Sequence, residues 1–171
     1  ECKNGLLNPV VIGSGPAGLF CALILAQAGC RPVILERGKD VDSRHEDIDD
    51  FYSTRKLNEE SNFLFGEGGA GTWSDGKLYT RVRDGRIGYI LDTFIKFGAP
   101  REIGYFSHPH IGSDKLPLLI SAIRDEIIAL GGGELKAKTT LAVDEYIAGL
   151  AKTRAGEKRA YGLFLGTASH D

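Results

Sequence analysis

Residues 9–37 read PVVIGSGPAGLFCALILAQAGCRPVILER, and this stretch decides the fold. It begins with a short β-branched run, VVI, which is typical of a strand buried on both faces. Gly13, Gly15 and Gly18 follow with the spacing G-x-G-x-x-G, and an apolar helical pattern comes after them. A second apolar run ends in Glu36, 18 residues beyond the last of these glycines. The order predicts a strand, a tight glycine turn, a helix and a second strand.

Each glycine has a physical function if the ligand is a dinucleotide. Gly13 lets the chain turn sharply out of the strand, and Gly15 has no Cβ, so backbone amides can come close to a pyrophosphate. Gly18 lets the helix pack closely against the sheet. The first helical turn begins near Pro16 and directs unpaired amides at the phosphates, where its dipole adds about 0.3–1 kcal/mol.

The carboxylate of Glu36 points to the adenosine end of such a ligand. We expect it to accept hydrogen bonds from the ribose hydroxyls, and its charge would repel a 2′-phosphate, which argues against NADP at this site. The alternative is an ordinary βαβ turn in which the glycines serve only for packing. The strand, the helix and the carboxylate at the expected distance together favour dinucleotide binding.

A second glycine-rich stretch, residues 58–80, reads NEESNFLFGEGGAGTWSDGKLYT. Glycine costs about 0.5–1 kcal/mol relative to alanine inside a helix or a strand, so this run predicts an irregular loop whose amides can approach a ligand closely. A flexible linker is the alternative, but Phe63, Phe65 and Trp73 make the stretch more aromatic than linkers are. We therefore expect a loop that clamps a ligand. Its glycines are interleaved with Thr72, Ser74 and Asp75, whose side chains can also reach a ligand.

The remaining periodicity predicts the rest of an α/β domain. Helices are expected over residues 41–55, 87–97 and 113–130, because apolar side chains recur there at helical spacing. A strand at residues 134–143 should lie beside residues 33–36 after a crossover connection.

We expect a single domain over the whole chain, with a parallel sheet, covering helices and an antiparallel hairpin. Its parts are the βαβ motif (9–37), an insertion with the glycine-rich loop (38–112), a helix and a strand (113–143) and a β-hairpin (144–165). Arg44 and His45 lie at the start of the first helix of the insertion. A solvated polar face and a phosphate contact are both open for them, and Arg44 is a candidate for the second.

Composition and charge exclude several classes of function. The net charge of −2 gives no basic excess for nucleic acid, the longest apolar run is too short to cross a bilayer, and residues 1–8 lack the apolar region of a secretory signal. The three cysteines form no C-x-x-C pair and are odd in number, so no disulfide framework is expected. His108 and His110 lie too close together for helical metal spacing, and no metal site is expected.

These observations favour a cytoplasmic protein without a membrane or nucleic-acid partner. The sequence does not begin with Met. We therefore expect a piece of a longer polypeptide, and organellar import stays open.

Together the two glycine stretches resemble a known superfamily. The pattern V-x-I-G-S-G-P-A-G-L, with E-R-G at the end of the second strand, resembles the FAD-binding half of two-dinucleotide-domain flavoproteins, the glutathione-reductase-like superfamily. More narrowly, RHEDIDDF, LNEESNFLFGEGGAGTWSDGKLYTR and HPHIGSDKLP are similar to FAD-dependent dehydrogenases of the NAD(FAD)-utilising type. The similarity covers about residues 9–143.

The resemblance implies FAD as cofactor, NAD(P)H as a candidate external electron donor, and a separate substrate domain that this sequence lacks. It places the pyrophosphate at the first glycine turn, the ribose at Glu36, and the adenine near Arg37 and the strand at residues 134–143. The second glycine stretch would run near the diphosphate or the flavin, with Asp75 and Lys77 near the isoalloxazine. Its residues that would contact the cofactor are Gly68, Gly69, Ala70, Gly71, Thr72, Ser74, Asp75 and Lys77. The residues of the first turn that would hold the cofactor are Gly13, Ser14, Gly15, Pro16, Ala17 and Gly18.

Three functions follow as hypotheses. The first is the FAD-binding portion of a flavin-dependent oxidoreductase acting on a small molecule of unknown identity. The second is a non-catalytic dinucleotide-binding module, and the third is an NAD-dependent dehydrogenase, in which the second glycine stretch would have no role. No Ser–His–Asp or paired-carboxylate pattern marks a catalytic group.

Overall fold

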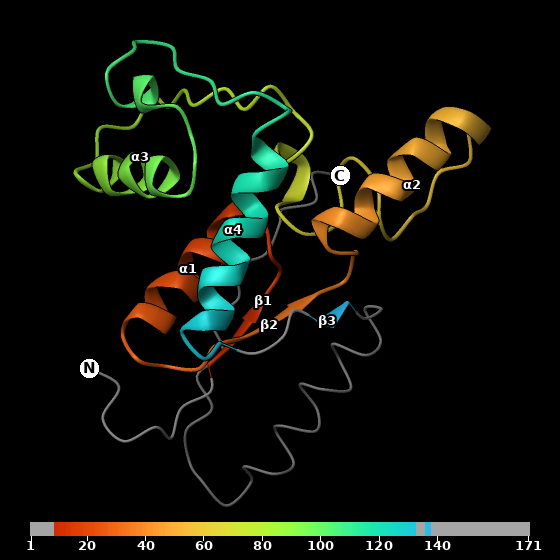
Figure 1. Ribbon diagram of the computed structural model, residues 1–171, viewed down its shortest axis with the longest axis horizontal. Helices are drawn as coiled ribbons and strands as arrows, with labels where there is room; N and C mark the ends of the chain where they lie inside the picture. Colours follow the sequence, from red (N-terminus) through yellow and green to blue (C-terminus); the bar gives the residue numbers. More distant parts are fainter. Residues whose placement is uncertain (1–8, 133–135, 138–171) are drawn as a thin grey trace, which may run out of the picture.

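The computed structural model describes residues 9–132 and 136–137, which form a small parallel sheet covered by helices (Figure 1). Strand β1 (Val10–Ile12) pairs with β2 (Val33–Glu36), with Val10 opposite Val33. β2 also pairs in parallel with β3 (Lys136–Ala137), so β2 lies in the centre of the order β1-β2-β3. The parallel βαβ opening is confirmed, and the described part of the third strand lies beside β2 as predicted.

Two apolar helices pack side by side over the sheet (Figure 1). They are α1 (Pro16–Gln27) and α4 (Leu116–Ala129). Leu19 and Leu23 of α1 and Ile123 of α4 are at most 1% exposed, within one continuous core that also contains Val11 and Ile34 of the sheet. Burial of this stripe, at about 25 cal/mol per Å² of apolar surface, is the main contribution that holds the layers together.

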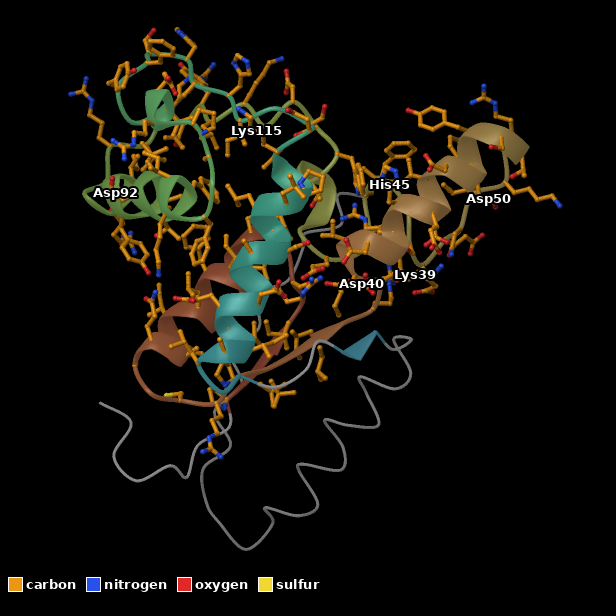
Figure 2. The ribbon with its side chains drawn as sticks, viewed as in Figure 1. Lys39, Asp40, His45, Asp50, Asp92 and Lys115 are labelled. Atoms are coloured by element: carbon orange, nitrogen blue, oxygen red, sulfur yellow. The ribbon has the colours of Figure 1, made fainter. Side chains whose placement is uncertain are left out.

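Helix α2 (Val41–Thr54) begins directly after β2. Asp40 is its N-cap and accepts a hydrogen bond from the Ser43 amide at 3.0 Å, which satisfies one of the unpaired amides of the first turn. Figure 2 shows Lys39 and Asp40 at this end of the helix, with His45 and Asp50 further along it.

Helix α3 (Arg86–Lys96) is joined to α1 and α4 by side chains. Phe20 of α1 meets the ring of Phe94 edge to face at 5.4 Å, and Lys96 forms an ion pair of 2.9 Å with Glu126 of α4. Two short 3-10 turns complete the described elements: η1 (Gly69–Gly71) in the glycine-rich stretch, and η2 (Arg101–Gly104), which packs against α3.

Some predictions differ from the structure or lie outside it. Leu130, the last residue of the apolar helix expected over residues 113–130, is 40% exposed, because the helix ends at Ala129 and the chain turns away at Gly131 with a φ of 90°. Cys21 is a free thiol, whereas Cys30 is disulfide-bonded, which the odd cysteine count did not predict. The predicted hairpin at 144–165 and most of the strand at 134–143 lie outside the described residues. Within the described ranges, no helix has the length and apolar character needed to cross a bilayer.

Candidate functional site

The first glycine turn connects β1 to α1 in the geometry that its spacing predicts. Gly13 has a φ of 88°, a left-handed conformation that favours glycine, and its amide donates to the Leu35 carbonyl at 2.8 Å. A Cβ on Gly18 would collide with the Gly13 carbonyl oxygen, so only glycine lets α1 pack this close to the turn. The predicted roles of these two glycines in shaping the turn are confirmed.

The space above Gly15 is open. Gly15 is the N-cap of α1, no side chain caps the helix, and no acidic residue lies in its first turn. A Cβ built on Gly15 would meet no atom within 4 Å, although the residue has an ordinary φ of −63°. The start of α1 therefore presents backbone amides to a space that an anionic group can approach.

Glu36 lies beside this turn and is held in place by Ser14. The amide and the hydroxyl of Ser14 donate to Glu36 Oε2 at 2.8 and 2.9 Å, and the Gly38 amide donates to Oε1 at 2.9 Å. Both residues are buried. The structure thus gives Ser14 the role of orienting Glu36, and its expected contact with a pyrophosphate stays a prediction, as does the contact of Glu36 with a ribose.

The second glycine stretch packs directly against the first. The Gly68 amide donates to the Ser14 carbonyl at 2.9 Å. A Cβ on Gly69 would lie 3.5 Å from Gly15 Cα and 3.6 Å from Pro16 Cδ, in van der Waals contact. Gly68 and Gly69 both have positive φ, 80° and 66°. Two stretches more than 50 residues apart in the sequence thus lie side by side, and the expectation that the second clamps a ligand stays a prediction.

Arg44 holds this loop from beneath. Its side chain is fully buried, and Nε, Nη1 and Nη2 donate to the carbonyls of Asn62, Glu67 and Phe63 at 2.8, 2.5 and 3.0 Å. The prediction of a solvated polar face is therefore wrong for Arg44. All three of its donor nitrogens bind backbone carbonyls, so the structure gives Arg44 no role in direct contact with a phosphate. The physical reason for its burial is that the carbonyls of an irregular loop need hydrogen-bond donors, and the position of Arg44 on α2 places its side chain beneath that loop.

A buried carboxylate, Glu67, ties the loop to two helices. Its Oε2 accepts from the Val41 amide at the start of α2 at 2.8 Å and from Arg124 Nη1 of α4 at 3.0 Å. Burial raises the pKa of Glu67, although the Val41 amide and the Arg124 charge act in the opposite direction. The backbone amide of Glu67 donates to the Lys39 carbonyl at 3.0 Å, so the residue also joins the loop to the connection between β2 and α2.

Glu67 and Arg124 were not predicted from the sequence, although each has a visible signal there. Glu67 is the single charged residue between Gly66 and Gly71, within a stretch that otherwise presents small side chains. Arg124 falls on the same helical face as Leu116 and Ile120, at i+8 and i+4, where the stripe is otherwise apolar. A charge at such a position indicates a buried partner.

Three other predicted residues, Arg37, Asp75 and Lys77, form ion pairs with side chains of the same chain. Arg37 forms an ion pair with Glu60 at 3.0 Å and lies over the ring of Phe65 at 4.8 Å. Asp75 and Lys77 pair with each other at 3.2 Å, and both side chains are exposed.

An apolar cavity of about 330 Å³ adjoins the contact between the two glycine stretches. Pro16 and Phe20 of α1, Phe94 of α3 and Ile120 of α4 supply much of its wall. The glycine-rich stretch contributes Gly68, Gly71, Thr72, Ser74, Gly76 and Lys77. Most of the predicted loop residues therefore face one hollow.

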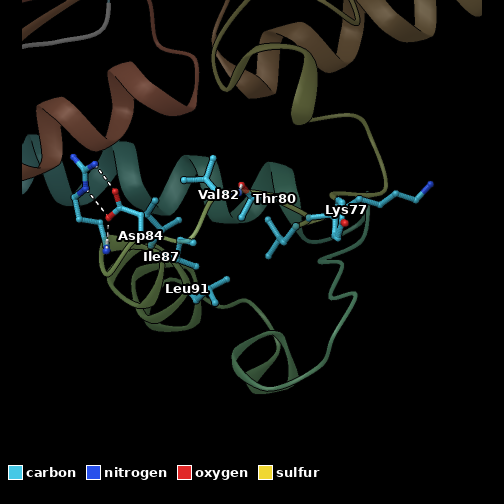
Figure 3. A pocket seen from close by; sticks show the side chains of 10 residues that line it. Lys77, Thr80, Val82, Asp84, Ile87 and Leu91 are labelled. Carbon is cyan, nitrogen blue, oxygen red and sulfur yellow. Dashed lines mark hydrogen bonds and ion pairs between the residues drawn. The ribbon is translucent and has the colours of Figure 1, made fainter.

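A second hollow of about 540 Å³ lies next to the first, between residues 77–84 and helix α3 (Figure 3). Leu78 and Lys77 line both hollows. Figure 3 shows Val82, Ile87 and Leu91 along this second hollow, with Asp84 bonded to Arg86 at its end.

The comparisons with known proteins agree with this geometry. Residues 11–56 match the family model of the NAD(P)-binding Rossmann-like domain. A protein of Clostridium beijerinckii, described as an uncharacterized protein, is 54% identical over 125 residues, which cover 73% of this chain and 24% of that protein. The chain thus spans about a quarter of the length of this relative. With the glycine turn, the open start of α1 and the carboxylate at the end of β2 in place, the chain carries a Rossmann-like dinucleotide-binding domain of the kind found in oxidoreductases.

Proposed function

We propose that this chain is the FAD-binding portion of a flavin-dependent oxidoreductase. The observation that carries the proposal is the packing of the two glycine stretches against each other: the Gly68 amide donates to the Ser14 carbonyl, and a Cβ on Gly69 would lie 3.5 Å from Gly15 Cα. A minimal NAD-binding βαβ unit needs only the first glycine turn. A second glycine-rich backbone built against that turn supports a longer ligand that extends past its pyrophosphate.

The residues present fit such a ligand. The open space above Gly15 and at Gly71, where added Cβ atoms would meet nothing, leaves room for phosphates near backbone amides. The adjoining apolar cavity offers a surface for a flat ring system. When bound, FAD would supply the hydride or electron transfer, while this chain binds and orients it.

The substrate domain lies outside this proposal for the chain itself. The chain spans 24% of the length of its relative. The binding sites for the substrate and the electron donor, and the catalytic groups, would therefore belong to other parts of a longer protein. We propose a small-molecule substrate and NAD(P)H as donor. A non-catalytic module would bind FAD without turnover in the longer protein.

Glycine-to-alanine variants test the proposal without disturbing the fold. Gly15 and Gly71 each have open space at the Cβ position and no positive φ, so alanine fits both sites in the folded chain. We expect G15A and G71A each to weaken FAD binding by about tenfold or more, which corresponds to roughly 1.4 kcal/mol, in a titration followed by flavin fluorescence. Gly85, at the start of α3, is also open at Cβ, and G85A is the matched control that leaves binding unchanged.

Titration with NAD⁺ distinguishes the two cofactors. Tight NAD⁺ binding that G15A weakens and G71A leaves unchanged, together with no FAD binding, would replace the proposal by an NAD-dependent dehydrogenase. That competing function is favoured by the family model, which describes NAD(P) binding.

A further inference from the structure

The guanidinium of Arg44 is buried without a carboxylate hydrogen-bond partner, and its removal from water costs free energy. Its side chain is fully buried, and its guanidinium contacts carbonyl groups rather than a carboxylate. Removing such a cation from water costs several kcal/mol, which hydrogen bonds must offset. Burial lowers the pKa of Arg44 to about 10, and the charges of Glu36 and Glu67 oppose that shift. A cation kept under these conditions indicates a function that an apolar side chain of similar size does not perform.

The three carbonyls that Arg44 binds belong to the segment leading into the glycine contacts. Asn62 and Phe63 precede Gly66, and Glu67 directly precedes Gly68, whose amide meets the first glycine turn. The planar guanidinium has five donors in a fixed arrangement, so a single side chain can fix several carbonyls that face different directions. Thr72 stabilises the same loop conformation, because its hydroxyl donates a hydrogen bond to the Glu67 carbonyl at 3.2 Å.

Gly66 and Arg44 fit each other. Gly66 has a φ of 117°, and a Cβ there would lie only 2.6 Å from Arg44 Cδ. The glycine therefore lets the arginine stem pass beneath the loop. Since this glycine faces Arg44 and the Lys39 carbonyl, its need for a small residue comes from the support of the loop.

We propose that Arg44 is a positioning residue for the dinucleotide, which holds residues 66–72 against the first glycine turn through the carbonyls of Asn62, Phe63 and Glu67. This inference rests on the proposed function for the identity of the ligand. It adds that the shape of the binding surface depends on a residue of α2 that touches no ligand atom. The guanidinium fork, not its charge alone, is the required feature.

The variant R44K tests this requirement, because lysine keeps the charge but cannot bind three divergent carbonyls at once. We expect R44K to weaken FAD binding by about tenfold or more, as the loss of a set of charged hydrogen bonds predicts. I48A is the matched control: Ile48 is buried on α2 one turn from Arg44, and its apolar side chain makes no hydrogen bond to the carbonyls of the loop, so its truncation destabilises the helix and leaves those hydrogen bonds in place. Equal weakening by R44K and I48A, at a temperature where both are folded, would reduce Arg44 to a general stabiliser and overturn the proposal.

A second readout needs no ligand. Trp73 is the one tryptophan of the chain, directly follows Thr72 and lies with its ring 5.1 Å from that of His45. We expect R44K to shift the tryptophan emission to longer wavelength and to speed proteolysis within residues 62–72, while I48A leaves both as in the wild type. An unchanged emission and cleavage pattern in R44K would overturn the proposal.

T72V provides a milder probe if R44K does not fold. It is nearly isosteric and removes both the hydrogen bond that the Thr72 hydroxyl donates to the Glu67 carbonyl and the one that this hydroxyl accepts from Arg44 Nη1 at 3.5 Å. We expect it to change emission and FAD affinity in the same direction by a smaller factor, and no change in either would count against the proposal. If G15A weakens FAD binding and R44K and T72V do not, this inference fails and the proposed function stands. If the wild type binds no dinucleotide, the proposed function fails and with it the role of Arg44 toward a dinucleotide, whereas a loop freed by R44K would still show that Arg44 supports residues 66–72.

Discussion

At the scale of single residues, Glu67 has the unusual chemistry of a buried carboxylate at the junction of three elements. Its side chain is 0% exposed, and burial raises its pKa above the ordinary value, against the effects of the Val41 amide and Arg124. When the folded-state pKa of a carboxyl group is raised, its contribution to stability is complete below the unfolded pKa. That contribution is lost as the pH rises through the folded pKa.

E67Q should therefore change how stability depends on pH. A neutral glutamine can still accept hydrogen bonds from Val41 and Arg124, but it does not ionise. We expect the unfolding free energy of the wild type to fall relative to that of E67Q as the pH rises from about 4 through the raised folded pKa, measured by urea unfolding at several pH values. E46Q, at an exposed position of α2, is the control for removal of a carboxylate. A wild type that gains stability relative to E67Q over this range would show that Arg124 lowers the pKa below its ordinary value.

At the scale of elements, α4 gives the clearest test of what stabilises the layer over the sheet. Ile123 is 1% exposed within the core, whereas Leu118 on the same helix is 71% exposed. We expect I123A to lower the unfolding free energy by about 2–5 kcal/mol, because it removes core contacts and leaves a cavity. L118A should change it by no more than about 0.5 kcal/mol. Similar losses for both variants in urea unfolding would contradict the burial of this stripe.

The same elements show what the sequence can and cannot predict. The strands and helices around the first glycine turn follow from local patterns, because spacing of glycines and apolar residues directly determines turn, helix and strand. Arg44 is different: its polar neighbours on α2 predict an exposed side chain, and only the tertiary fold brings the carbonyls of Asn62 and Phe63 to it. Its burial depends on contacts 18 or more residues away, which periodicity does not encode.

The binding surface shows the same division. Gly13 and Gly18 could be predicted because their φ and close packing are properties of the turn itself. The hydrogen bond between Ser14 and Glu36 could not be predicted, since it depends on the register of β2 against β1. Side-chain partners across elements are therefore the part of the site that requires the structure.

At the scale of the whole molecule, the two glycine stretches predict a single footprint for the ligand. They are far apart in sequence but share the hydrogen bond from Gly68 to Ser14, so a dinucleotide that touches one should order both. Helix α3 packs at the edge of the apolar cavity, and its outer face is remote from this contact (Figure 1). A ligand bound only at the first turn would instead leave residues 66–72 unchanged.

Hydrogen exchange with and without FAD measures this footprint. At a ligand concentration of 100 times Kd, binding adds about 2.7 kcal/mol to the global stability, which slows every amide that exchanges by complete unfolding. Local protection appears over that uniform effect. We expect it at residues 13–19 and 66–72 together, in the wild type and in G85A, with R44K protecting the first segment more than the second. Protection confined to residues 13–19 in the wild type would mean that the second glycine stretch is a structural support of the first and does not contact the ligand.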